Sequence, residues 1–274
     1  MLFDERGQTA AHRGHELAAP GSDLQPAIRD TRLGGQASTP FEAPTLRCVY
    51  EDRLLIGDIP ARLYMPAAAS GLLLLGHGGD QSKDAERFVT LACFYAEQTG
   101  LCVVCIDAVD HGQRRPVAPA EGLPAGWHSR TSPQMVDDWT SVVGNLSSIG
   151  PAVAYVGFSM GAVFGIPVVA SMPTIAAAVL VVGGIPGGGW TDDPGLAPLL
   201  TRAAASLDST HVLMLNKTDD ELFPSQDVEL LFDSVSAKTK ELRFWPGSHD
   251  DWGSELLETS ANFVNRHCGP AVEL

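Results

Sequence analysis

Residues 152–161 read Ala-Val-Ala-Tyr-Val-Gly-Phe-Ser-Met-Gly, and this stretch decides the fold. Its apolar first half predicts a buried strand, and a helical pattern begins at Gly161. Residues 157–161 fit G-x-S-x-G, in which a serine occupies a sharp turn between a strand and a helix. Such a turn strains the serine backbone and accepts only very small residues two positions to either side. Gly157 and Gly161 meet that need, so Ser159 is a candidate nucleophile.

Strands and helices alternate on both sides of this turn. We predict strands at 72–75, 101–106, 152–156, 175–182, 211–215 and 241–245, and helices at 85–98, 134–146, 161–170, 196–207, 226–237 and 252–267. This alternation is typical of an α/β fold with a mainly parallel sheet and helices on both faces. Two further strands, at 46–50 and 54–65, are predicted to be antiparallel. A loop over 108–131 and a second loop over 183–195 are rich in Pro and Gly.

The chain is expected to form one domain preceded by an arm. Residues 1–44 contain many Gly and Pro and no apolar periodicity, which predicts a loosely ordered segment. Residues 45–274 are expected to form a single α/β domain, because a chain of this length can bury one large core.

Composition excludes several classes of protein. The 274 residues carry 18 basic and 33 acidic side chains, a net charge of −15, which disfavours binding to nucleic acids. Residues 139–191 carry no charge, but Pro and Gly break this stretch into pieces shorter than the roughly 20 residues of a membrane span. No membrane span is therefore expected.

The N-terminus and the cysteines indicate a reducing compartment. The chain begins without a basic leader followed by an apolar run, so a cytoplasmic location is expected. Five cysteines suggest no disulfide framework. Cys102 and Cys105 fit C-x-x-C, but residues three apart in a strand point to opposite faces, so buried thiols are expected instead of a redox pair.

A serine hydroxyl needs a base and a group that orients the base. Asp219 and Asp220 follow the predicted strand 211–215, and His249 follows the strand 241–245. Because the carboxyl ends of parallel strands share one edge, these side chains can converge on Ser159. The order Ser, acid, His is the one expected for such a fold.

These motifs resemble the α/β-hydrolase superfamily, nearest to its dienelactone-hydrolase-like and small serine esterase branches. The resemblance covers residues 45–274 and includes Gly-His-Gly-Gly at 76–79, G-x-S-x-G at 157–161, Asp-Glu-Leu-Phe-Pro at 220–224 and the Gly-Ser-His turn at 247–249. Dienelactone hydrolases proper use a cysteine nucleophile, and the serine at position 159 favours general ester hydrolysis instead.

The resemblance implies a role for each of these residues. It makes Ser159 the nucleophile, His249 the general base and acid, and Asp220 the orienting carboxylate, because Asp220 has the family's spacing to Pro224. Asp219 is the rival for the carboxylate. Asp192 and Asp193 are weaker alternatives, since some relatives carry the acid after the strand that ends near residue 182.

Two backbone N–H groups are expected to stabilise an oxyanion, those of Met160 and Gly79. His77 beside them is expected to be structural. Three loop aromatics, Trp127, Trp190 and Phe223, are expected to line an apolar substrate pocket.

The loop after strand 101–106 holds Asp110 and His111, which could be taken for metal ligands. Relatives with a similar segment use it to shape the loop, so no metal is expected.

The sequence therefore predicts a serine hydrolase that cleaves a carboxylic ester or thioester of a small molecule and needs no cofactor. An acyltransferase or peptidase with the same triad, or a non-catalytic ligand-binding relative, remains an alternative. The acyl and alcohol groups, the pathway and the oligomeric state are left open.

Overall fold

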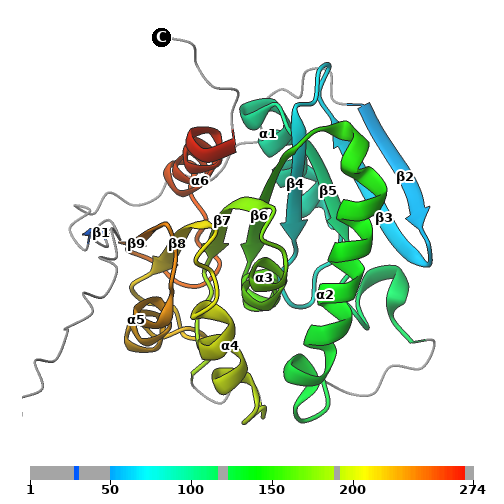
Figure 1. Ribbon diagram of the computed structural model, residues 1–274. Coiled ribbons are helices and arrows are strands. Elements are labelled where there is room, and N and C mark those ends of the chain that lie inside the picture. The colour runs from blue at the N-terminus through cyan, green and yellow to red at the C-terminus, as the bar shows by residue number, and fades with distance from the viewer. Residues whose placement is uncertain (1–27, 31–49, 117–122, 188–191, 269–274) are drawn as a thin grey trace, which may run out of the picture.

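A computed structural model describes residues 28–30, 50–116, 123–187 and 192–268 (Figure 1). These residues form a nine-stranded sheet in the order β1-β9-β8-β7-β6-β4-β5-β3-β2. The strands are β1 (Ile28–Asp30), β2 (Tyr50–Ile56), β3 (Ile59–Met65), β4 (Gly71–Gly76), β5 (Cys102–Ile106), β6 (Ala152–Phe158), β7 (Ile175–Val181), β8 (His211–Lys217) and β9 (Thr239–Trp245). In this sheet order, all neighbouring strands from β1 through β9, β8, β7, β6 and β4 to β5 pair in parallel. Strand β3 pairs antiparallel with both β5 and β2. The predicted α/β fold is confirmed.

Helices cover both faces of the sheet (Figure 1). Their bounds are α1 (Glu86–Thr99), α2 (Trp127–Leu146), α3 (Met160–Ser171), α4 (Leu196–Ala204), α5 (Ser225–Ser234) and α6 (Ser254–Cys268), with short 3₁₀ turns η1 (Gly112–Arg114) and η2 (Ser147–Ile149). Helices α1 and α6 share one apolar core with the sheet, and α2, α3, α4 and α5 share the other. Among the described helices none is both long and apolar enough to cross a membrane.

Successive side chains of a strand point to opposite faces of the sheet, so an apolar strand contributes side chains to both cores. In β4, Leu72 and Leu74 belong to the α2–α5 core, whereas Leu73 and Leu75 belong to the α1–α6 core. The same alternation separates Cys102 and Cys105, as predicted, and burial raises the pKa of the Cys102 thiol to about 11. A buried thiol with a raised pKa is unreactive.

The largest differences from the sequence predictions are the division between β2 and β3 and the start of α2. The first two predicted strands were divided at the wrong place, because the turn of the β2–β3 hairpin falls at Gly57, whose φ is +60°. The charged residues 51–53 lie within the edge strand β2, where their side chains are exposed to solvent. Helix α2 begins at Trp127, inside the predicted loop, and contains Pro133 in its second turn.

Strand β1 lies inside the segment that was predicted to be a loosely ordered arm. Its three residues pair in parallel with β9, from Ile28 opposite Glu241 to Asp30 opposite Arg243. The rest of residues 1–49 lies outside the described residues.

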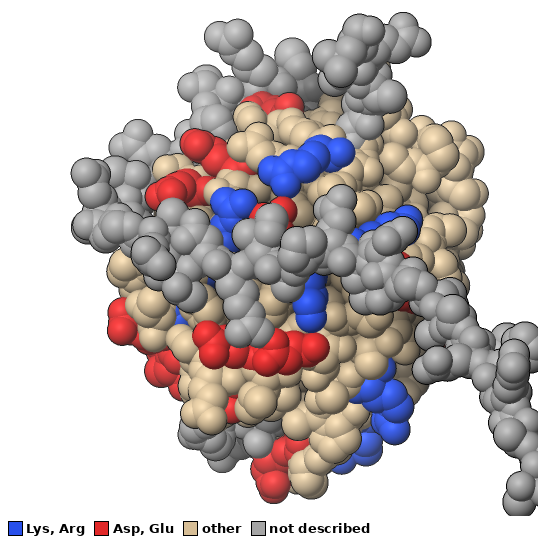
Figure 2. Space-filling model, turned by 60° about the vertical axis from the view of Figure 1, so that its left-hand side comes forward, with Lys and Arg blue, Asp and Glu red and all other residues tan. Residues whose placement is uncertain are grey.

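On the face shown in Figure 2, acidic and basic side chains are interspersed, so the acidic excess of the chain is not gathered there in one patch.

The serine turn depends on close backbone packing between β4, β6 and α3. A Cβ on Gly161 would lie 2.3 Å from the carbonyl oxygen of Gly76, and one on Gly157 would lie 2.3 Å from the carbonyl oxygen of Gly161. Both of these carbonyl oxygens belong to the backbone of regular elements or their ends, so displacing either one would strain the surrounding packing.

We therefore expect Gly161→Ala to lower the free energy of unfolding by about 1–3 kcal/mol. Gly144→Ala is the matched control, because a Cβ at Gly144 meets no atom within 4 Å and the position is inside α2. That control should stabilise the protein by roughly 0.5–1 kcal/mol. Urea unfolding of both variants checks the pair, and equal effects at the two positions would contradict the packing argument.

Candidate active site

Ser159 lies between β6 and α3 in a strained backbone conformation, with φ 53° and ψ −115°. The strain is held by hydrogen bonds on both sides of the residue. Its N–H donates to the carbonyl of Val181 at 2.9 Å, and its carbonyl accepts from the N–H groups of Ala162 at 2.8 Å and Val163 at 3.0 Å. The turn presents the hydroxyl at the carboxyl end of β6, as the motif predicted.

Strain is concentrated along this edge of the sheet. Among the described residues, the non-glycine residues with positive φ are Asp80, Asp110, Ser159 and Val182. They follow the ends of β4, β5, β6 and β7 respectively, which are neighbouring strands in space. Unfavourable backbone conformations persist where the surrounding structure holds them in place, and they cluster at functional sites.

The structure brings His249 and Asp220 to Ser159. The Nε2 atom of His249 lies 2.9 Å from Ser159 Oγ, and its Nδ1 atom lies 2.8 Å from Asp220 Oδ2. All three residues are at most 6% exposed. The other carboxylate oxygen of Asp220 accepts the backbone N–H groups of Leu222 and Phe223, each at 2.9 Å. Asp220 is therefore held by its own loop.

This geometry sets the direction of proton transfer. A carboxylate only accepts hydrogen bonds, so Nδ1 of His249 carries the proton that it donates to Asp220. The Nε2 atom is then the acceptor and faces the hydroxyl of Ser159. Such a hydroxyl can lose its proton to the imidazole at the moment it attacks a carbonyl.

The alternative acids are engaged elsewhere. Asp219 Oδ2 accepts the hydroxyl of Thr218 at 3.1 Å and the N–H of Gly247 at 3.3 Å. Asp193 accepts the N–H and the hydroxyl of Ser129, each at 2.7 Å, and so holds the first turn of α2. Asp219 therefore braces a loop and Asp193 a helix start, whereas Asp220 contacts the imidazole.

The loop after β4 runs beside Ser159. A Cβ placed on Gly78 would lie 3.6 Å from the Cβ of Ser159, and one on Gly79 would meet no atom within 4 Å. Met160 is the first residue of α3, where an N–H has no partner within the helix. Met160 thus directly follows Ser159, and the loop that contains Gly79 passes close to Ser159 at Gly78. Their role as oxyanion donors stays a prediction.

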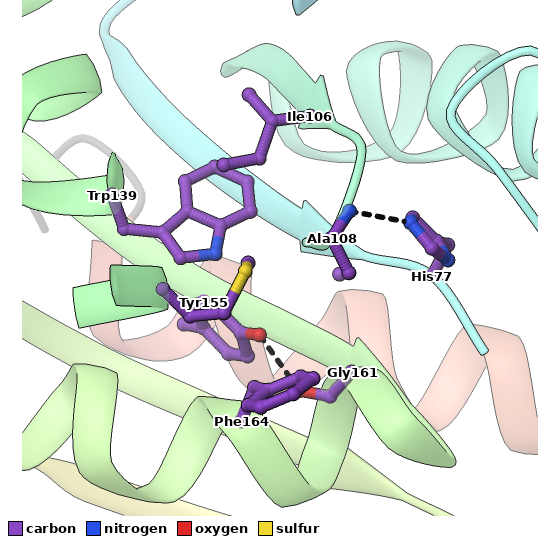
Figure 3. A pocket seen from close by; sticks show the side chains of 9 residues that line it. His77, Ile106, Ala108, Trp139, Tyr155, Gly161 and Phe164 are labelled. Atoms are coloured by element: carbon purple, nitrogen blue, oxygen red, sulfur yellow. Dashed lines mark hydrogen bonds between the residues drawn. The ribbon is translucent and has the colours of Figure 1, made fainter. Parts of the chain in front are cut away.

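His77 braces this loop from inside the protein (Figure 3). Its Nδ1–H donates to the carbonyl of Gly78 at 2.8 Å, and its Nε2 accepts the N–H of Ala108 at 2.9 Å. Both nitrogens are therefore used by the neutral ring. Burial lowers the pKa of His77 to about 4.

This lowered pKa predicts a loss of stability in acid. The unfolded chain binds a proton at His77 near pH 6.5, whereas the folded protein does so only near pH 4. The contribution of His77 is full above about pH 6.5 and decreases as the pH falls toward 4. Urea unfolding between pH 7 and 4.5 should show a shallower pH dependence in His77→Gln than in the native protein. Equal slopes would contradict the assignment.

The loop after β5 is shaped by buried charges. Lys83 Nζ lies 2.9 Å from Asp107 Oδ2 and 2.7 Å from both Asp84 Oδ2 and Gln113 Oε1. Asp110 accepts the indole N–H of Trp127 at 2.8 Å. No group of three His, Cys, Asp or Glu side chains suited to a metal occurs in the described ranges.

The three predicted pocket aromatics have different outcomes. Phe223 is buried and stacks on the imidazole of His249 with 5.7 Å between ring centres. Trp127 was wrongly placed in a loop, because it begins α2 and packs edge-on against Phe164 at 5.5 Å. Trp190 lies outside the described residues. Whether these side chains line a substrate pocket stays a prediction.

A small cavity lies beneath the serine turn and is too small for substrate. It measures about 10 Å³, which is room for one water, and Figure 3 shows Trp139, Tyr155, Phe164 and Gly161 around it. The hydroxyl of Tyr155 donates to the carbonyl of Gly161 at 2.7 Å. This support was not predicted from the sequence, although Tyr155 lies in the strand that leads to Ser159.

The residues that hold the loop of His249 were also not predicted from the sequence. Trp252 and Arg87 contact the backbone next to the imidazole. Trp252 could have been suspected because it follows His249 by three residues. Arg87 lies far away in the chain, and no local pattern singles it out.

Comparisons with known proteins agree with this architecture. The model of the alpha/beta hydrolase family matches residues 72–261. A cold-adapted esterase from an Arctic intertidal metagenomic library is 26% identical, with a TM-score of 0.66 over 80% of this chain and 93% of that chain. TT1662 from Thermus thermophilus is 20% identical, with a TM-score of 0.64 over 80% of this chain and 98% of that one. The Pyrococcus furiosus esterase Pf2001 is 15% identical, with a TM-score of 0.61 over 81% and 93%.

The two likenesses below 25% identity bear on the fold alone. No curated protein sequence matches the chain.

Proposed function

Because the chain belongs to the alpha/beta hydrolase family, we propose that it hydrolyses a carboxylic ester or thioester through an acyl-enzyme at Ser159. The observation that carries this proposal is the unbroken series of hydrogen bonds from the Ser159 hydroxyl through His249 to Asp220. The likeness to the Arctic esterase supports an ester as substrate.

In the first half of the proposed reaction, Ser159 Oγ attacks the carbonyl carbon while its proton moves to Nε2 of His249. The resulting imidazolium is paired with the Asp220 carboxylate. When the tetrahedral intermediate collapses, the bond to the leaving oxygen or sulfur breaks and His249 returns the proton to it. The products are an alcohol or thiol and an ester on Ser159.

The intermediate places a negative charge on the former carbonyl oxygen. We assign its stabilisation to the backbone N–H groups of Met160, which begins α3, and of Gly79, in the loop that passes Ser159 at Gly78. Loss of one such donor typically costs about 2.7–4 kcal/mol of transition-state stabilisation. The amino end of α3 adds its dipole to the Met160 donor.

In the second half, a water molecule takes the place of the leaving group. Nε2 of His249 accepts a proton from this water, whose oxygen attacks the ester carbonyl on Ser159. Collapse releases the carboxylic acid and returns the proton to Oγ. Every proton in the cycle moves through His249, so the proposed chemistry uses neither a metal nor an organic cofactor.

A fluorophosphonate probe tests this proposal before any substrate is known. The probe phosphonylates an activated serine, and we expect one label per chain, located on Ser159 by peptide mass spectrometry. Ser159→Ala and heat-unfolded native protein are the controls, and neither should be labelled. A folded native protein that takes no label, or takes it at another serine, would contradict the assignment.

A panel of esters tests the chemistry itself. Aryl and alkyl esters of increasing acyl length, with thioesters in parallel, would identify the acyl group that the site prefers. Added alcohols distinguish hydrolysis from acyl transfer, because a transferase yields a new ester in their presence. A small-molecule substrate and a cytoplasmic location are part of the same proposal.

A further inference from the structure

His249 is carried by an irregular segment, residues 246–253, between β9 and α6. Several side chains of this segment are exposed, including those of Ser248 and Asp250, whereas the side chain of His249 is buried. Hydrogen bonds to Asp220 and Ser159 orient the ring, but they do not hold the backbone that carries it. Some other contact must keep the backbone at the distance that those bonds require.

Trp252 provides one such contact. Its indole N–H donates to the carbonyl oxygen of His249 at 2.8 Å. The same indole stacks on Phe158, with 4.5 Å between ring centres and a tilt of 34°. Phe158 is fully buried and directly precedes Ser159. The Trp252 ring therefore connects the backbone of His249 with the strand end that carries the hydroxyl.

Arg87 of α1 provides the second contact. Its guanidinium carbon lies 3.4 Å from the centre of the Trp252 ring. Two groups this close to a ring cannot share one face, so Arg87 and Phe158 lie on opposite faces of Trp252. The Nη2 atom of Arg87 also donates to the carbonyl oxygen of Asp250 at 2.8 Å, and Nη1 lies 3.3 Å from Asp250 Oδ1. Carbonyls of two successive residues are thus held, that of Asp250 by Arg87 of α1 and that of His249 by Trp252 of the same irregular segment.

We infer that Arg87 and Trp252 are positioning residues, and that this Arg87–Trp252 clamp keeps His249 within hydrogen-bond distance of Ser159. The inference rests on the proposed hydrolase function. A displacement of about 1 Å in a reacting group can lower a rate about a hundredfold, because proton transfer and attack need aligned atoms. The clamp touches no reacting atom and acts through its contacts with residues 249 and 250.

Arg87→Met tests the clamp by removing the charge and the donors while keeping a long aliphatic side chain. We expect kcat for the best ester to fall about 10- to 100-fold, with KM changed less than about twofold. The rate of fluorophosphonate labelling at Ser159 should fall by a similar factor. Arg87→Lys keeps the cation and one donor, so it should recover part of the loss.

Arg202→Met is the matched control, since Arg202 is an exposed arginine on helix α4. It should leave kcat and labelling unchanged. Trp252→Phe keeps an aromatic ring between Arg87 and Phe158 but loses the indole N–H. We expect about a tenfold fall in kcat, and the double variant with Arg87→Met should lose less than the product of the two single effects.

A purely structural role predicts a different result. In that case Arg87→Met would lower the melting temperature but leave kcat unchanged well below it. That result, or equal losses in Arg87→Met and Arg202→Met, or a change confined to KM, would overturn the inference.

Failure of the proposed function is a separate outcome, because it would appear as native protein that reacts with neither esters nor probe. The low-field proton signal of His249 Nδ1–H reads the geometry without turnover. It should broaden or shift in Arg87→Met and not in Arg202→Met, and an unchanged signal in both would overturn the clamp.

Discussion

Ser159→Ala is expected to lower kcat for a p-nitrophenyl ester by about 10⁴- to 10⁶-fold while leaving the protein folded. The hydroxyl oxygen is the atom that we propose forms the covalent bond, and alanine removes only that atom from a residue 5% exposed. Binding and the oxyanion donors remain, so a small residual rate over the uncatalysed reaction is expected. Steady-state kinetics and a melting curve on the same preparation check both parts.

A second substitution at this position separates chemistry from strain. Alanine keeps the unfavourable backbone conformation of φ 53° and ψ −115°, whereas glycine adopts positive φ easily. Ser159→Gly should therefore be as inactive as Ser159→Ala but more stable, by about 1–3 kcal/mol. If a preparation of Ser159→Ala that contains no contaminating native enzyme keeps more than about a hundredth of the native rate, Ser159 is not the nucleophile.

Asp220→Asn is expected to lower kcat about 10⁴-fold. An amide presents an N–H₂ group to the imidazole, so Nδ1 of His249 becomes an acceptor and Nε2 carries the proton. In that tautomer Nε2 cannot accept the Ser159 proton. The effect arises from the hydrogen bond of 2.8 Å between His249 and Asp220.

Asp219→Asn is the matched control for this prediction. Its carboxylate accepts hydrogen bonds from Thr218 and Gly247 and so braces neighbouring loops without contacting the imidazole. We expect a loss of less than about tenfold, because an amide oxygen can still accept both bonds. A larger loss at position 219 than at 220 would reverse the assignment of the orienting acid.

Combining substitutions tests whether the three residues act as a unit. Without the Ser159 hydroxyl the attack cannot occur, so the tautomer of His249 has no further effect on the rate. Ser159→Ala/Asp220→Asn should therefore be about as slow as Ser159→Ala alone. Additive losses would mean that Asp220 acts on some step that does not involve the serine.

Local patterns were sufficient to predict much of the fold. The glycines of residues 157–161 predicted the strand, turn and helix around Ser159. The helix predicted over 85–98 agrees with α1, which ends at Thr99 and is capped by Gly100 with a φ of +66°. Where propensity and tertiary context disagree, local patterns failed. The charged residues 51–53 fell between two predicted strands, yet they belong to an edge strand. The helix predicted from residue 134 begins at Trp127 and contains Pro133.

The sequence by itself determined which residue types are available at the carboxyl ends of the strands. Ser159, Asp220 and His249 each follow a recognisable strand, and parallel pairing places those ends on one edge. Chain order and turn chemistry are local properties, so they can be read directly from neighbouring residues.

Only the tertiary structure decided which carboxylate faces the imidazole and what holds the imidazole in place. Asp219 and Asp220 are adjacent in sequence, and the choice between them depends on the path of a loop that is anchored by Leu222, Phe223 and Gly247. Arg87 reaches Asp250 across 163 positions of the chain. Contacts over such separations depend on the packing of whole elements, and no short pattern encodes that packing.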